Sequence, residues 1–440
     1  MPPAHGFTLY EEAMQQLEVA SPSWLRALRA HALEAFRRMG FPTARVEDWK
    51  YTDVSPIARE PFSLPPPPSP DLLAETSRDR FGINASATLR FLLGQATHEG
   101  VQGCELPNTV RVHPLRVALT AEEALVRRSL GSSIASDEAP FAALNTALVQ
   151  DGGFVHVPAG TRVAAPIQLL FVNTTVARPT ILCPRNLIVL EDGAAATVVE
   201  FWAGHSPVAV FTNAVTEIVL GRGATLTHLR IVEERDGLMH MGTTAVRQAA
   251  DSVYRSRVFT FGGRWARVEI QTRLEDAGAA TYLDGLFIAD GPTLVDHHTA
   301  IDHVSGRTTS RQLYKGVLDG SAHGVFNGKV FVRPGALKSD AQQMNKNLLL
   351  SDDAEIDTKP QLEIFADDVK CSHGAAIGRL DESALFYLQS RGIAAEDARR
   401  LLIYAFANEI VERVELEPAR ATLQGILRRR LAAAPEENAA

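Results

Sequence analysis

Cysteine is scarce in this sequence. The 440 residues include three cysteines, at Cys104, Cys183 and Cys371. An odd count this low in a long chain argues against a disulfide framework and predicts a reducing compartment. It also excludes a four-thiolate metal site within one chain. Any metal or cluster held through sulfur would therefore need further donors from elsewhere.

The chain also lacks an excess of positive charge and lacks long apolar runs. Lys plus Arg total 44 and Asp plus Glu total 52, so the net charge is −8, which argues against nucleic acid as the main partner. No stretch approaches the roughly 18 apolar residues of a membrane span, and residues 1–12 show no signal-peptide pattern. We therefore expect a cytoplasmic protein with no membrane partner.

Motifs of three common enzyme classes are absent as well. No GxxxxGK[ST] sequence occurs, so ATP binding through a P-loop is not expected. No G-x-S-x-G nucleophile elbow occurs. The Gly-Arg-Gly run at 221–223 is not followed by a helical pattern, which argues against a dinucleotide-binding unit. This search yields no candidate catalytic residue.

The N-terminal part divides at a proline run. Residues 8–40 carry apolar side chains at three- and four-residue steps, which predicts helix, with Ser21 as an N-cap and a stop at Gly40. Pro65–Pro68, closed by Pro70, has a polyproline-like composition and marks a boundary. We therefore assign residues 1–70 to an N-terminal helical segment with a Pro-rich linker.

Residues 71–150 predict a mixed α/β part. Its expected strands are 88–94 and 110–112, and its expected helices are 121–130 and 139–148. Thr120, followed by Glu123, fits a capping box at the start of the first of these helices.

From about residue 151 the pattern changes to short β-branched and aromatic runs separated by Gly, Asp and Asn. A weak repeat of an apolar residue, a turn and a small residue recurs in this region, at 190–194, 220–224, 332–336 and 350–354. Irregular strand-and-turn repeats favour a parallel β-helix, or β-solenoid, over 151–375, with a β-sandwich as the alternative. Helical periodicity returns over 376–440, with expected helices at 381–391, 395–416 and 418–431.

Two clusters offer metal-binding side chains. The first contains Asp296, His297, His298, Asp302 and His303, which could bind a metal but are more simply explained as polar residues of strands and turns. On an unbroken strand Asp296, His298 and Asp302 would share one face, and His303 would face the other way. In the second, Cys371 and His373 are two residues apart and would share one face of a strand. Thiolate and imidazole suit iron, zinc or copper, but two donors cannot close a site. A nucleophile–base pair is the alternative for these two residues.

The region from Asp296 to Glu412 resembles the SufB/SufD family of iron–sulfur cluster assembly proteins. The stretches that carry this resemblance occur in order along the chain, at 315–317, 324–329, 345–351, 359–364, 368–375, 378–381 and 385–392. Glu47–Thr52 and the low cysteine count favour the SufD branch of the family.

The resemblance implies a right-handed parallel β-helix between helical ends and a non-catalytic role. It further implies a complex with SufB and the SufC ATPase. An edge strand near the C-terminal end of the β-helix could pair with SufB, and the same edge could pair with itself to give a homodimer where SufB is absent. By position His373, with Cys371 beside it, would contribute to a transient iron–sulfur cluster shared with SufB, and His373 is the candidate metal ligand. The C-terminal helices would dock SufC, and the residues expected to do so are Leu385, Phe386, Tyr387 and Arg391.

Two other functions stay open at this stage. A β-helix enzyme acting on polysaccharide would use clustered carboxylates in a long groove. A metal-free homodimeric interaction module would need neither the Cys–His pair nor a cluster.

Overall fold

The computed structural model of the chain describes residues 21–67, 87–98 and 106–432, together with residues 10, 14, 17, 83, 85 and 101. Cys104, Pro68 and Pro70 lie outside the described residues.

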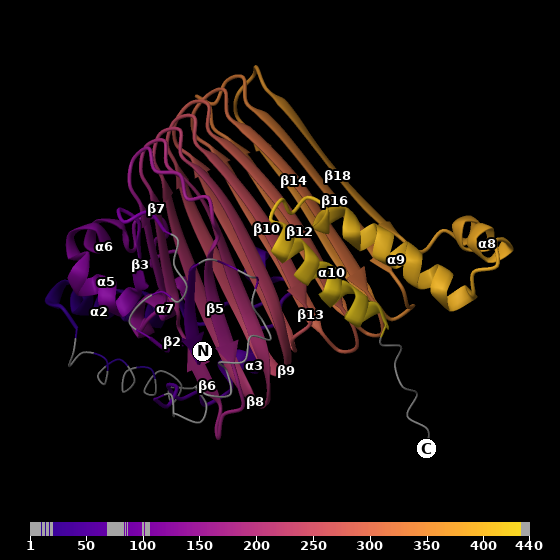
Figure 1. Cartoon of the computed structure of the whole chain (residues 1–440), viewed down its shortest axis with the longest axis horizontal. Coiled ribbons are helices and arrows are strands. Elements are labelled where there is room, and N and C mark those ends of the chain that lie inside the picture. The colour runs from indigo at the N-terminus through magenta and orange to yellow at the C-terminus, as the bar shows by residue number, and fades with distance from the viewer. Residues whose placement is uncertain are drawn as a thin grey trace.

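Parallel strands dominate the fold and form two ladders that face each other across a shared interior (Figure 1). We call them ladder A and ladder B. They are continuous because β8 (Ala195–Leu220) and β9 (Thr225–Gln248) each run through both. The first halves of β8 and β9 belong to ladder A and the second halves to ladder B.

The remaining strands alternate between the ladders along the chain. Ladder A also contains β1 (Ala87–Leu92), β5 (Ile167–Asn173), β10 (Val253–Phe261), β12 (Ala280–Ala289), β14 (Thr309–Leu318), β16 (Asp340–Leu349) and β18 (Lys370–Gly378). Ladder B also contains β4 (Gly153–Val157), β7 (Arg185–Leu190), β11 (Trp265–Leu274), β13 (Leu294–His303), β15 (His323–Val332) and β17 (Glu355–Ile364). The short strands are β2 (Gln95–Ala96), β3 (Arg111–Pro114) and β6 (Thr180–Leu182).

Each full coil adds one strand to each ladder. Successive coils are offset by 27 residues at the pair Val253–Ala280 and by 32 at the pair His323–Glu355. The prediction of a parallel β-solenoid is therefore confirmed, and the β-sandwich alternative is wrong.

Stacked tight turns explain the sequence repeat. Gly193 and Gly223 have φ of 68° and 65°, a left-handed conformation that glycine adopts without strain. The turns at 190–194 and 220–224 lie one coil apart, and the Gly193 amide donates to the Arg222 carbonyl at 2.7 Å. The turns at 332–336 and 350–354 instead flank β16, on opposite sides of one coil, which explains their shorter spacing.

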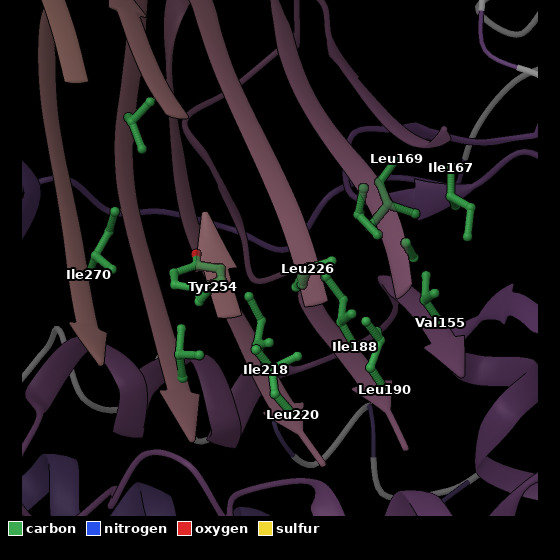
Figure 2. Close-up of a cluster of buried hydrophobic side chains, with 14 of the residues drawn as sticks. Val155, Ile167, Leu169, Ile188, Leu190, Ile218, Leu220, Leu226, Tyr254 and Ile270 are labelled. Atoms are coloured by element: carbon green, nitrogen blue, oxygen red, sulfur yellow. The ribbon is translucent and has the colours of Figure 1, made fainter. Parts of the chain in front are cut away.

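The interior between the ladders is mainly apolar. Figure 2 shows Ile188 and Ile218 of ladder B beside Leu226 and Tyr254 of ladder A. Burial of such side chains stabilises the fold by about 1.5–3 kcal/mol each. One layer is charged: the buried Glu200 carboxylate accepts from Arg230 at 2.7 Å, and from Thr216 and His228.

N-terminal elements pack on the outer face of ladder B. They are α2 (Ser23–Met39), η1 (Glu47–Trp49), α3 (Ser55–Ala58), α5 (Leu115–Ala121), α6 (Glu123–Ser129) and α7 (Pro140–Leu148).

The segment Glu47–Thr52 is anchored on ladder B by the Trp49 ring and by its polar groups. The Arg267 guanidinium lies 3.6 Å from the centre of the buried Trp49 ring, and Arg267 donates to the Asp48 carbonyl at 2.8 Å. Thr52 donates to the buried Asp296. Lys329 pairs with the Asp48 carboxylate.

The C-terminal helices are α8 (Glu382–Ser390), α9 (Ala395–Val411) and α10 (Glu417–Ala432). Of these, α9 and α10 cover the outer face of ladder A (Figure 1). The Lys315 ammonium donates to the Phe406 carbonyl at 2.8 Å, and Arg413 pairs with Asp284 at 2.9 Å. Helix α8 has no buried residue and projects away from the strands.

Two predicted helix starts are wrong. Pro22, and not Ser21, is the N-cap of α2, because the Ser21 hydroxyl donates to the Leu17 carbonyl. Thr120 lies inside α5 and donates to the Val117 carbonyl, so it cannot cap α6. The helix stop at Gly40 and the three C-terminal helices are confirmed.

Candidate functional site

The two last strands of the solenoid have free edges within the described part of the chain. β18 pairs with β16 alone, and β17 pairs with β15 alone. No residue of either strand is fully buried, whereas every residue of β5 and β7 is. This end of the solenoid, formed by β17 and β18, is called the open end below.

Cys371 and His373 lie on β18 at the open end. Their register partners on β16 are Ala341 and Gln343, both buried, so the pair occupies the inner face of ladder A. The prediction that the two side chains share one face agrees with this register. His373 is exposed because no further coil covers it. Its imidazole is accessible to a partner or a ligand.

Cys371 has a different environment from its neighbour. Its side chain is partly buried against the apolar group that contains Val330 and Val332. Burial raises the pKa of the Cys371 thiol, although a backbone hydrogen bond from Ala341 acts in the opposite direction. The thiol therefore stays protonated at neutral pH, and it would have to lose its proton to bind a metal.

A short polar column lies behind His373. The Thr299 hydroxyl donates to the side-chain oxygen of Gln312 at 2.9 Å, and the Gln343 side-chain amide donates to the same oxygen at 3.4 Å. The Gln343 side-chain oxygen is buried with no hydrogen-bond partner. The strand register puts Gln343 beside His373. Sequence reasoning missed Gln343, because its place depends on the length of the last coil.

Large apolar side chains are exposed around the open end. Met344, Ile364 and Ile377 are 38%, 43% and 52% exposed, and Phe365 is 58% exposed. Apolar side chains that gather beside free strand edges are typical of a protein interface.

Helix α8 carries the residues predicted to dock a partner. Phe386 and Tyr387 are 73% and 57% exposed, Leu385 is half-buried, and the Arg391 guanidinium lies over the Tyr387 ring at 5.2 Å. The Asp381 carboxylate caps the helix by accepting from the Ser383 amide at 2.8 Å.

The first predicted cluster has a structural environment. Burial would raise the pKa of Asp296, but the charge of Arg267, 2.7 Å away, outweighs it and holds the pKa at about 2. The His298 Nε2 atom lies 2.9 Å from the other oxygen of this carboxylate. His303 lies on the opposite face of β13, bonded to Thr308 and Ser310. These contacts favour the interpretation as strand-face polar residues over a metal site.

Among the described residues, no helix is long and apolar enough to cross a membrane.

The fold and the open end together define a class of protein: a β-solenoid whose last strand carries a partly buried thiol and an exposed imidazole beside free strand edges. Comparison with known proteins gives the family. Residues 171–406 match the family described as "SUF system FeS cluster assembly, SufBD core domain", and residues 5–169 match the "SufBD protein N-terminal region". The chain belongs to the SufBD family of iron–sulfur cluster assembly proteins.

Several relatives align over most of their length. An iron–sulfur cluster assembly SufBD family protein of Synechocystis is 35% identical over 412 residues, which cover 91% of this chain and 89% of the relative. The iron–sulfur cluster assembly protein SufD of Escherichia coli is 33% identical over 384 residues, covering 86% and 87%. SufD of Bacillus subtilis is 27% identical over 420 residues, covering 93% and 94%.

Proposed function

We propose that this chain is a non-catalytic scaffold subunit of the SUF system. It pairs with SufB through β17 and β18, docks the SufC ATPase on its C-terminal helices, and supplies His373 to a transient iron–sulfur cluster at the SufB interface. The observation that carries the proposal is the position of Cys371 and His373 on the inner face of the last strand, at a free sheet edge.

The number of cluster-binding side chains in this chain supports a site that is shared with a second subunit. Iron–sulfur clusters are usually held by about four ligands, mostly thiolates. Cys371 and His373 supply at most two, and Cys183 is fully enclosed elsewhere, with a pKa raised by burial. The imidazole of His373 is the better placed donor because it is exposed. The cluster is cargo in this scheme, and the missing sulfur donors come from SufB.

Helix α8 gives a route by which SufC could act on this site. β18 ends at Gly378 and α8 begins at Glu382, so only a short link joins the strand that carries His373 to the exposed helix. Lys315 ties α9 to ladder A, and Arg413, just after the helix ends, pairs with Asp284 of the same ladder. A displacement of α8 would therefore act on the free strand β18 before it acts on the rest of the solenoid.

The test is cluster formation on the reconstituted complex. His373→Ala should lower the cluster yield while folding and complex formation remain unchanged, because the side chain is exposed and packs on nothing that the strand needs. His205→Ala is a matched control, since His205 is also an exposed histidine on a strand. An unchanged yield with His373→Ala would refute the proposed role.

The polysaccharide-acting alternative fits the structure less well. Such an enzyme needs an open groove along the coils, but α9 and α10 cover the outer face of ladder A, and Glu47–Thr52 crosses that of ladder B. A metal-free homodimer would use the same free edges. Iron and sulfide analysis of the complex purified anaerobically separates it from the scaffold proposal.

A further inference from the structure

A second group of metal-binding side chains lies on the outer face of ladder B. His323 of β15 and Glu355 and Asp357 of β17 each offer one ligand atom, and these atoms all lie within 4.8 Å of one another. Within the described part of the chain, no other group of three His, Cys, Asp or Glu residues meets this spacing. The group is distinct from Cys371 and His373, which lie on the inner face of ladder A.

The strand register creates this arrangement. His323 and Glu355 are direct partners across β15 and β17, and Asp357 lies two residues further along β17 on the same face. Two donors at i and i+2 of one strand, with a third on the neighbouring strand, converge without help from a loop. Ligands on paired strands are held more precisely than ligands on loops.

The local contacts favour a cation. The His323 Nε2 atom lies 2.8 Å from an Asp357 carboxylate oxygen, and both side chains are about one quarter exposed. Glu355 is exposed and forms no ion pair within 4.0 Å in the described part of the chain. Of the nearby cations, Lys359 pairs with Glu47, and Lys50 hydrogen-bonds Tyr51 at 3.3 Å.

We propose that His323, Glu355 and Asp357 bind a divalent first-row transition metal ion such as Fe²⁺ or Zn²⁺. One imidazole with two carboxylates suits such ions better than Ca²⁺ or Mg²⁺, which prefer oxygen ligands alone. Three protein ligands leave coordination positions open to solvent or to an exchanging ligand. The proposal does not depend on the function proposed above, although it would place a loosely held metal ion on the last strand of ladder B.

The test is a Co²⁺ titration of the full chain, followed by its visible absorption. The background carries Cys371→Ser and His373→Ala, so that the open end cannot compete for the ion. We expect saturable binding of one Co²⁺ per chain, displaced by Zn²⁺ or by anaerobic Fe²⁺ and not by millimolar Mg²⁺. His323→Ala and Asp357→Asn should each weaken binding by at least about 10-fold, the effect usual even for outer-shell partners of a metal.

His156→Ala is the matched control. His156 also bonds a carboxylate through Nε2, that of Glu191 at 3.0 Å, but it belongs to no group of three donors. It should leave Co²⁺ binding unchanged. Absence of saturable binding, or binding that His323→Ala and Asp357→Asn leave intact while the circular dichroism melt is unaltered, would overturn the proposal and leave a solvated ion pair. Because the background removes His373, neither result bears on cluster assembly at the open end.

Discussion

The first and last coils of the solenoid differ in how far their polar side chains are enclosed. In the first coils the buried Glu200 carboxylate accepts from His228 and Arg230, which are also enclosed. On the last strand, β18, His373 is exposed. Charged and polar groups are therefore structural where another coil covers them, and they are available for binding where the coils end.

The largest expected loss of stability follows from a substitution in the enclosed first coils. Glu200→Ala leaves Arg230 buried without its carboxylate and should lower the free energy of unfolding by about 3–5 kcal/mol. Urea denaturation followed by circular dichroism measures this. Glu191→Ala removes the exposed partner of His156 and should cost less than about 1 kcal/mol. Equal losses for the two variants would contradict the comparison.

Buried histidines should make stability depend on pH. Burial lowers the pKa of His297 and of His303 to about 4, from the usual 6.5. The unfolded chain therefore binds more protons between pH 6.5 and 4, so stability falls as the pH is lowered through this window.

Each of these two histidines should contribute up to about 3 kcal/mol to the loss of stability between pH 7 and pH 4. Urea unfolding at several pH values measures how steeply the free energy of unfolding changes with pH. This pH dependence should be weaker in His303→Asn. If His303→Asn left the pH dependence of the free energy of unfolding unchanged, burial of His303 would not be a cause of the loss of stability at low pH.

The exposed helix α8 should tolerate changes that the enclosed helices cannot. Phe386→Asp with Tyr387→Asp should leave unfolding unchanged but weaken SufC binding by about 30-fold, equal to about 2 kcal/mol, as for interface hot spots. Binding can be measured by calorimetry with purified SufC. Leu337→Asp is the control, because Leu337 is 49% exposed in a turn of the solenoid. Retained SufC affinity in the α8 variant would count against docking on this helix.

The smallest expected difference in the free energy of unfolding is between substitutions of two buried glutamines. Gln248 donates to the Ala280 carbonyl at 3.1 Å and accepts from Thr281, so Gln248→Met should cost about 1–3 kcal/mol by leaving polar groups unpaired. Gln343 already has an unpaired oxygen, and Gln343→Met should change stability by less than about 1 kcal/mol. Denaturation of the two variants in parallel tests this difference. A larger loss for Gln343→Met would mean that its column is part of the stabilising core.

Period-two patterns and turn residues made the solenoid predictable. Gly193 and Gly223 marked stacked turns, and the two-residue spacing of Cys371 and His373 indicated a shared face. Strand β8 bends through both ladders, with an irregular register between Ser206 and Val210. The sequence alone does not predict this, because a bend inside one long strand has no local pattern that distinguishes it from a turn between two strands.

Contacts between segments that are far apart in the chain could not be predicted from the sequence. The group of His323, Glu355 and Asp357 depends on a register offset of 32 residues, and coil length varies along the solenoid. The same limit applied to Asp296, whose partner Thr52 comes from the N-terminal part. A local pattern can assign a side chain to a face, whereas its neighbour in the next coil follows from the lengths of two turns.

Within the described residues, the two ends of the parallel ladders differ. At the beginning of the solenoid β1 pairs with β2 and β4 pairs with β3, both antiparallel. A further copy stacked head to tail on ladder B would meet the antiparallel strand β3, which does not match the free edge of β17. Under the proposed pairing through β17 and β18, association would therefore favour pairs over filaments, whether the second subunit is a relative or a copy of this chain. Such a polarity would let the cell make this protein in excess of its partner without polymerisation.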